Sequence, residues 1–238
     1  YYEGFSPTID HPSVEWIKYE TAITEHAGWK TEYLAKTQHS EYVKTMTVRF
    51  SHKAFVIQHA LQNNTNDYLI WLDGDCIFKT ADYSNFPKSV IKDQLLACQV
   101  EHNQELNHIE SGILIFNGKH KDKLGFAEQL AKCYSVNNII NMTQPYDGFL
   151  IFKTLLLTKI KYLDLNEKYG KGGIQSDPNM TFCHPDIQSK FIHNIGWTGK
   201  NQYENWNTVF KQDDIYKVMK NALFPTSKNK VLNIKKQN

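Results

Sequence analysis

The segment YLIWLDGDCIF, residues 68–78, constrains the fold of this chain more than any other part of its sequence. Its first residues are apolar and predict a buried strand that reaches Leu72. Asp73 and Asp75 follow this strand, separated by Gly74. A charged group is costly to bury without a partner, so the strand should end at Asp73. We therefore expect both carboxylates at the end of this strand, held by a partner that neutralises their charge.

Predicted strands alternate with predicted helices along the rest of the chain. Helical spacing of apolar residues predicts helices over residues 13–28, 52–64, 120–135, 144–159 and 205–223. Ser13 and Ser51 are the predicted caps of the first two helices, and Gly28 is the predicted end of the first. Further strands are expected over residues 95–101, 111–117, 161–166 and 190–195. This order predicts an α/β layered domain with a central, mostly parallel sheet flanked by helices, which binds ligands at the carboxyl ends of its strands.

The composition is that of an ordinary globular protein and argues against two classes of function. The 238 residues fit a single domain over residues 1–238, which is compatible with being one domain of a longer polypeptide. A formal net charge of +2 argues against a nucleic-acid partner. No apolar run approaches the roughly 20 residues that span a bilayer, so no membrane span is expected. Four cysteines without CxxC spacing predict reduced thiols and a cytoplasmic location.

Two carboxylates as close in sequence as Asp73 and Asp75 repel each other unless a cation or several donors stabilise both. A hard divalent ion, Mn²⁺ or Mg²⁺, takes oxygen ligands and keeps positions free for phosphate oxygens. Gly74 permits a tight turn and the close approach of a ligand. A solvated turn with two surface aspartates is the alternative. Apolar sequence on both sides of the motif favours the metal site.

The segment KFIHNIGWTGK, residues 190–200, supplies the second part of the predicted site. His193 lies at the end of a short predicted strand, and a neutral imidazole can complete a metal site that already has carboxylates. Gly196 would let the backbone approach a diphosphate, and Lys200 would offer that diphosphate a positive charge. A histidine taken alone is more often a structural, hydrogen-bonded residue. Beside the aspartates, His193 is predicted to be a metal ligand.

These motifs resemble those of nucleotide-sugar glycosyltransferases of the GT-A fold, a Rossmann-like layered domain. The apolar strand with its Asp-x-Asp motif and the late histidine and lysine are similar to the glycogenin-like and lipopolysaccharide galactosyltransferase-like retaining enzymes. The resemblance implies that Asp73 contacts the ribose or the metal, and that Asp75 and His193 bind Mn²⁺ or Mg²⁺ on the donor diphosphate. It implies that Lys200 contacts that diphosphate.

Four further residues are candidates for the rest of the site. The resemblance implies a basic residue on the helix before the Asp-x-Asp motif, and Arg49 and Lys53 lie there, four residues apart. A solvent-exposed basic pair is the alternative. Asp147, in the turn QPYDG, and Glu110, in the strand ESGILIFN, compete for the role of catalytic base toward the acceptor. The strand ESGILIFN also resembles the family's strand beside the donor sugar, with Glu110 in the place of the usual Asn.

The expected activity is a metal-dependent transfer of a sugar from a UDP-sugar to a hydroxyl of a glycan acceptor, on a cell-surface polysaccharide or glycoconjugate. The resemblance implies retention of configuration, whereas the residues themselves leave donor sugar, acceptor and stereochemistry open. One alternative is a phosphatase or phosphotransferase of the haloacid dehalogenase type, with Asp73 as the nucleophile. The other is a non-catalytic, metal-dependent sugar-binding module.

Overall fold

A computed structural model gives the fold of the chain and describes residues 1, 15–73, 76–78, 86–101, 107–142, 145–166 and 185–193. Contacts group the chain into two compact units, one of residues 20–195 and one of residues 1–19 with 196–238. The architecture described below is that of residues 20–195. The single domain over residues 1–238 stays a prediction, and the helix predicted over residues 205–223 lies outside the described residues.

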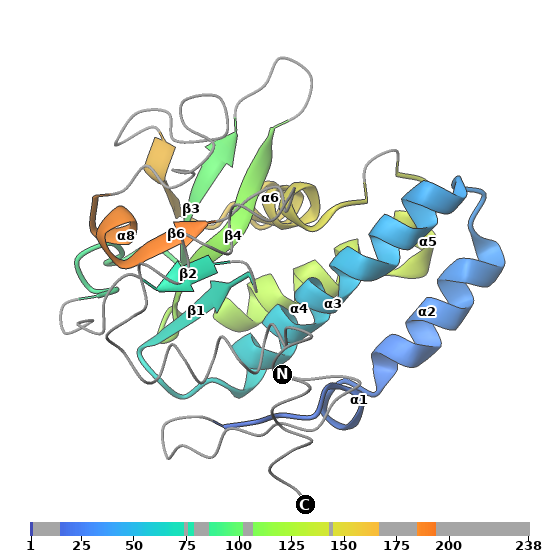
Figure 1. Cartoon of the computed structure of the whole chain (residues 1–238), viewed down its shortest axis with the longest axis horizontal. Coiled ribbons are helices and arrows are strands. Elements are labelled where there is room, and N and C mark those ends of the chain that lie inside the picture. The colour runs from blue at the N-terminus through green and yellow to red at the C-terminus, as the bar shows by residue number, and fades with distance from the viewer. Residues whose placement is uncertain are drawn as a thin grey trace, which may run out of the picture. The chain divides into compact units, whose positions relative to one another are not determined.

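The centre of this unit is a four-stranded mixed sheet with the strand order β1-β4-β3-β5 (Figure 1). Its strands are β1 (Tyr68–Leu72), β4 (His108–Asn117), β3 (Leu96–Glu101) and β5 (Tyr162–Asp164). β4 runs antiparallel to its two neighbours, β1 and β3, whereas β3 and β5 run parallel. All four strands lie where the sequence predicts them, and the chain is a mixed α/β protein with helices flanking the sheet.

The prediction of a mostly parallel sheet is wrong for the described part of the chain, because two of the three strand pairings are antiparallel. The reason is the short connection between β3, which ends at Glu101, and β4, which begins at His108. A parallel return needs a crossover of about a dozen residues or more, so a connection this short forces antiparallel pairing.

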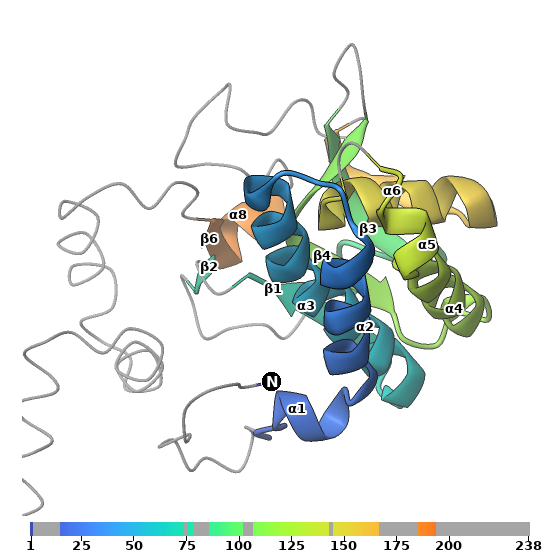
Figure 2. The ribbon, with the colours of Figure 1, turned by 90° about the vertical axis from the view of Figure 1, so that its right-hand side faces the viewer.

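Helices cover one face of this sheet (Figure 2). They are α3 (Glu41–Asn63), α4 (Lys123–Cys133) and α6 (Asp147–Thr158). Phe116 of β4 packs on Phe126 of α4, with ring centroids 6.0 Å apart, and both side chains are fully buried. The helices predicted over residues 120–135 and 144–159 are therefore confirmed, and their apolar faces form the larger part of the core.

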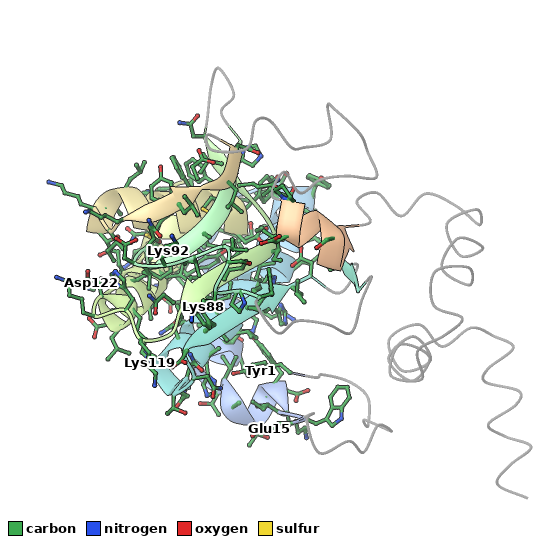
Figure 3. All side chains as sticks on the ribbon, turned by 90° about the vertical axis from the view of Figure 1, so that its left-hand side faces the viewer. Tyr1, Glu15, Lys88, Lys92, Lys119 and Asp122 are labelled. Carbon is green, nitrogen blue, oxygen red and sulfur yellow. The ribbon has the colours of Figure 1, made fainter. Side chains whose placement is uncertain are left out.

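A smaller apolar cluster covers the other face of the sheet. Ile113 and Ile115 of β4 belong to it together with Ile187 of α8 (Pro185–Lys190). Alternate residues of β1, Ile70 and Leu72 among them, pack against the same cluster. Figure 3 views the molecule from this side, with Lys88 and Lys92 beside the strands. Because strand side chains alternate between faces, Trp71 and Asp73 belong to the helix-covered side.

The bounds predicted for the N-terminal helix are wrong. The structure has a short helix α1 (Tyr19–Ala22) and a longer helix α2 (Glu25–Lys36), which continues through Gly28 instead of ending before it. Trp29 and Tyr33 on α2 are buried and stack with ring centroids 5.2 Å apart. Burial of these rings outweighs the cost of about 1 kcal/mol that a glycine adds inside a helix. A further short helix, α5 (Val136–Ile139), follows α4.

Helix α3 begins well before its predicted cap. Ser40 is the cap, and its hydroxyl accepts a hydrogen bond from the backbone N–H of Val43 over 3.4 Å. Ser51 is instead fully buried inside the helix, where its hydroxyl donates to the carbonyl of Val48 over 2.7 Å. Since that bond uses the hydroxyl proton, Nε2–H of His26 is the donor in its 2.7 Å contact with Ser51 Oγ.

This buried histidine packs α2 against α3. Burial first, and then electrostatic interactions with His52 and Lys30, lower the pKa of His26 from 6.5 to about 4. The imidazole is therefore neutral near pH 7. Its hydrogen bond to Ser51 needs only one ring proton, which agrees with a neutral ring.

Within the described residues, no helix combines the length and the apolar character that crossing a membrane requires.

Candidate functional site

The strand β1 delivers Asp73 to the edge of the sheet, as the sequence predicts. The backbone N–H of Asp73 still pairs with the carbonyl of Gly112 on β4, at 2.9 Å, so the residue is fixed by the sheet although the strand has ended. The Asp73 side chain is 26% exposed, which leaves it accessible from solvent. Its Oδ1 accepts a hydrogen bond from the indole Nε1–H of Trp71 over 2.6 Å.

Lys53 of α3 lies at the centre of a compact polar cluster. Its Nζ lies 2.7 Å from Oδ1 and 3.0 Å from Oδ2 of Asp73, and 2.6 Å from Oδ2 of Asp147. The same ammonium donates to Oγ of Ser111 over 2.9 Å. The Lys53 side chain is only 10% exposed, so helix α3 carries a buried cation toward the end of β1.

Asp147 occupies the first turn of α6 and is 4% exposed. Its Oδ2 accepts a hydrogen bond from Oγ of Ser111 over 2.7 Å, in addition to the contact with Lys53. A carboxylate at this end of a helix is also favoured by the helix dipole. Gly148 lets α6 come this close to the sheet, because a Cβ at that position would collide with the backbone carbonyl of Ile109.

The cluster of Lys53, Asp73, Ser111 and Asp147 (the Lys53 cluster) carries one cation and two carboxylates, a net formal charge of −1. Burial alone would lower the pKa of Lys53, but the carboxylates of Asp147 and Asp73 outweigh it and raise that pKa above its ordinary value. Lys53 therefore stays protonated across the physiological range. The remaining negative charge makes the cluster a place that attracts a second cation.

An irregularity in β4 aims Ser111 into this cluster. Ile113 and Ile115 face the smaller apolar cluster, and strict alternation would send Ser111 to that side too. However, the pairing of β3 with β4 shifts register. Ala97 pairs with Ile115, whereas Gln99, two residues later, pairs with Glu110, so the extra residues lie on β4. Extra residues on one strand of a pair change the direction of its side chains, and such bulges occur beside active sites. The shift falls on the segment that contains Ser111.

A second, two-stranded sheet joins distant parts of the chain next to the Asp-x-Asp motif (Figures 1 and 2). β2 (Cys76–Phe78) pairs antiparallel with β6 (Phe191–His193), and the register places Cys76 opposite His193. Directly opposite residues in such a pair have Cα atoms about 4.5–5.5 Å apart. The backbone of His193 therefore lies beside the residue that follows Asp75 directly.

Ile187 anchors the segment that carries β6. Its helix α8 immediately precedes β6, and Ile187 is fully buried in the cluster that contains Leu165 and Ile91. Leu72 and Cys76, on either side of the Asp-x-Asp motif, pack against the same cluster. Apolar burial thus packs the residues on either side of the Asp-x-Asp motif and the helix before β6 against one cluster.

The structure brings some of the predicted site residues together and leaves others apart. Lys53, Asp73 and Asp147 meet in the Lys53 cluster, and Glu110 lies next to it on β4, where its Oε1 accepts from the N–H of Gly112 over 2.9 Å. Arg49 lies one helical turn before Lys53, and its side chain is exposed and is not part of the cluster. The predicted site residues Asp75, Gly196 and Lys200 lie outside the described residues.

Of the three predicted metal ligands, the structure describes the side chain of Asp73. Within the described part of the chain, Oδ1 of Asp73 accepts a hydrogen bond from Trp71 and Oδ2 accepts one from Lys53, whose Nζ also lies 2.7 Å from Oδ1. A carboxylate has about four acceptor positions, so Asp73 retains capacity for a metal ion or a ribose hydroxyl. Among the described residues, no three His, Cys, Asp or Glu side chains come together as a metal site. The other two predicted ligands are Asp75 and the side chain of His193, which those residues do not include.

Sequence reasoning missed Trp71 and Ser111 as members of the site. Trp71 precedes Asp73 by two residues, the spacing that puts two strand residues on one face, so the signal was present. Ser111 belongs to the strand ESGILIFN, where it follows Glu110 directly and precedes the apolar run. Its direction depends on the register shift in β4, which no local pattern reveals.

An open hollow of about 570 Å³ lies at a different place, between the start of α4 and the end of α6. Asp122, which Figure 3 labels, lines it together with Lys159 and Lys161. It shares no lining residue with the Lys53 cluster, so the candidate site is defined by the cluster and not by this hollow.

No protein-family model, curated protein sequence or solved structure matches the chain. In the Lys53 cluster, two carboxylates share one buried ammonium at the accessible end of a strand. These carboxylates can bind a cationic ligand or accept hydrogen bonds from the hydroxyl groups of a sugar. The cluster can also hold those ligands rigidly, because every member of it has at least two partners.

Proposed function

We propose that this protein is a metal-dependent glycosyltransferase of the GT-A type that moves a sugar from a UDP-sugar to a hydroxyl of a glycan acceptor. The observation that carries the proposal is the pairing of β2 with β6, with Cys76 opposite His193. It supports a shared site for the Asp-x-Asp motif and a histidine more than a hundred residues away in sequence. Such convergence is unexpected for two surface aspartates in a solvated turn.

Asp75, His193 and the free capacity of Asp73 would hold Mn²⁺ or Mg²⁺, whose carboxylate and imidazole ligands are of the type these residues supply. When bound, the metal would act as a Lewis acid toward the leaving diphosphate. Lys200 would add positive charge where the leaving group becomes negative, and Gly196 would allow the backbone to approach it.

The Lys53 cluster would form the donor side of the site. Asp147 and Ser111 are held rigidly, and a carboxylate so held can accept hydrogen bonds from hydroxyls of the donor sugar. Asp147 and Glu110 remain the two candidates for the catalytic base. Glu110 is the less buried of the two, and a base must come within hydrogen-bond reach of the acceptor hydroxyl. A retaining enzyme would need neither, because the leaving phosphate can take the proton.

Calorimetric titration of UDP, with and without Mn²⁺, tests the proposal on the wild type and on the variants Asp75→Ala and His193→Ala. We expect UDP binding that requires Mn²⁺ and is lost in both variants. Asp67→Ala is the matched control, since Asp67 precedes the opposite end of β1 and its side chain is 77% exposed. That variant should bind UDP like the wild type.

Other results would point to other functions. A UDP affinity that is the same with and without Mn²⁺, and the same in Asp75→Ala as in the wild type, would contradict the metal site. A protein that binds no UDP but releases phosphate from p-nitrophenyl phosphate would be a phosphatase with Asp73 as nucleophile. A protein that binds glycans in a metal-dependent way without nucleotide would be a sugar-binding module.

A further inference from the structure

We infer that Trp71 is a positioning residue of this site, one that fixes both the orientation of the Asp73 carboxylate and the place of the Lys53 ammonium. Trp71 itself lies in the middle of the β1–β4 pairing, opposite Leu114, so its backbone is held by the sheet. Its indole ring is partly exposed on the helix-covered side. The functional half of this inference rests on the proposed donor site.

The N–H edge of the Trp71 indole holds the Asp73 carboxylate in its orientation. Its Nε1–H donates to Oδ1 over 2.6 Å, the short distance of a bond to a charged acceptor. Nζ of Lys53 lies 2.7 Å from the same oxygen and donates a hydrogen bond to Oδ2 over 3.0 Å. The indole and the ammonium together fix the plane of the carboxylate, and each oxygen keeps a further acceptor position for a ligand. Without the indole donor, only Lys53 would hold the carboxylate, and its plane could rotate.

The face of the Trp71 ring holds the Lys53 ammonium in place. Nζ of Lys53 lies 5.6 Å from the centroid of the indole ring, within the range of a cation–π interaction. The ring also covers one side of the ammonium, whose hydrogen bonds go to Asp73, Asp147 and Ser111 on the other sides. Trp71 thus contacts both partners of the Lys53–Asp73 ion pair. A side chain that does not touch the ligand can in this way fix the orientation of the groups that do.

The hydrogen bond can be observed without any ligand, by ¹⁵N–¹H NMR of the indole groups. The Trp71 resonance is identified by its loss in Trp71→Phe. We expect it far downfield in the wild type, and we expect it to move upfield in Asp73→Asn, whose amide is a neutral acceptor. A resonance that does not respond to Asp73→Asn would overturn the inference.

The effect on ligand binding is measured by a double-mutant cycle on the UDP affinity in Mn²⁺. Trp71→Phe keeps an aromatic face for Lys53 and removes only the donor, and we expect a loss of about tenfold, as for one hydrogen bond to a charged group. Combined with Asp73→Asn it should cost little more than Asp73→Asn alone. Additive losses would mean that Trp71 acts elsewhere and would overturn the inference.

Trp29→Phe is the matched control, because Trp29 also loses an indole hydrogen bond, its 2.5 Å bond to the carbonyl of Tyr134. It should lower thermal stability without lowering the UDP affinity and without coupling to Asp73→Asn. If the wild type binds no UDP, the proposed function fails, and the NMR experiment still decides whether Trp71 holds Asp73.

Discussion

Replacing Lys53 by Met would test the electrostatics of the cluster most directly. Methionine has a similar length but no charge, so the variant leaves Asp73 and Asp147 without their cation and changes the net charge of the cluster from −1 to −2. At an effective dielectric constant of about 20, a charge pair near 2.6 Å is worth about 6 kcal/mol before desolvation is counted. Desolvation cancels part of this, and breaking one partner out of a buried pair typically costs about 3–5 kcal/mol.

We therefore expect Lys53→Met to lower the free energy of unfolding, measured by urea denaturation, by about 3–5 kcal/mol. The double variant Lys53→Met/Asp147→Asn restores the net charge to −1 and should recover part of the loss. Lys44→Met is the control on the same helix: its exposed pair with Glu41, at 2.9 Å, should contribute less than about 0.5 kcal/mol. A cost below about 1 kcal/mol for Lys53→Met, or a further loss of stability on adding Asp147→Asn, would contradict a cluster held together by its charges.

Three further predictions concern the scaffold. Gly148→Ala should lower stability by about 1–3 kcal/mol in thermal melts, because its Cβ would meet the Ile109 carbonyl. Gly28→Ala, with open space around it, should instead raise stability by about 0.5–1 kcal/mol. Equal effects of the two substitutions would contradict the close approach of α6 to the sheet. The lowered pKa of His26, about 4, keeps the folded imidazole neutral. Stability should therefore fall by about 3 kcal/mol as the pH drops from about 6.5 to about 4, and then level off. Urea titrations at several pH values should find this change missing in His26→Phe. Lys159 is left-handed, with φ of 53°, so Lys159→Gly should raise the melting temperature, and a fall would show that its side chain stabilises the fold.

The local elements were predictable because their signals are local. The apolar run before Asp73 predicts both β1 and its end, and periodicity predicts α4 and α6. The bounds failed where tertiary packing outweighs a local signal. Gly28 does not end α2, because Trp29 and Tyr33 are buried on the same helix. The antiparallel pairing of β3 with β4 was also within reach of the sequence, since the connection is too short for a crossover.

The chemistry of the candidate site can be read from the residues: a strand end with Asp73 and Asp75, a basic helix before it, and a late histidine. Which of these groups meet depends on how the chain folds. Lys53 rather than Arg49 reaches Asp73, because α3 buries one of these side chains and exposes the other. The register shift in β4 and the pairing of Cys76 with His193 depend on contacts between residues far apart in the chain. Such contacts form because they bury apolar surface across the whole core, so the pattern of a single segment cannot predict them.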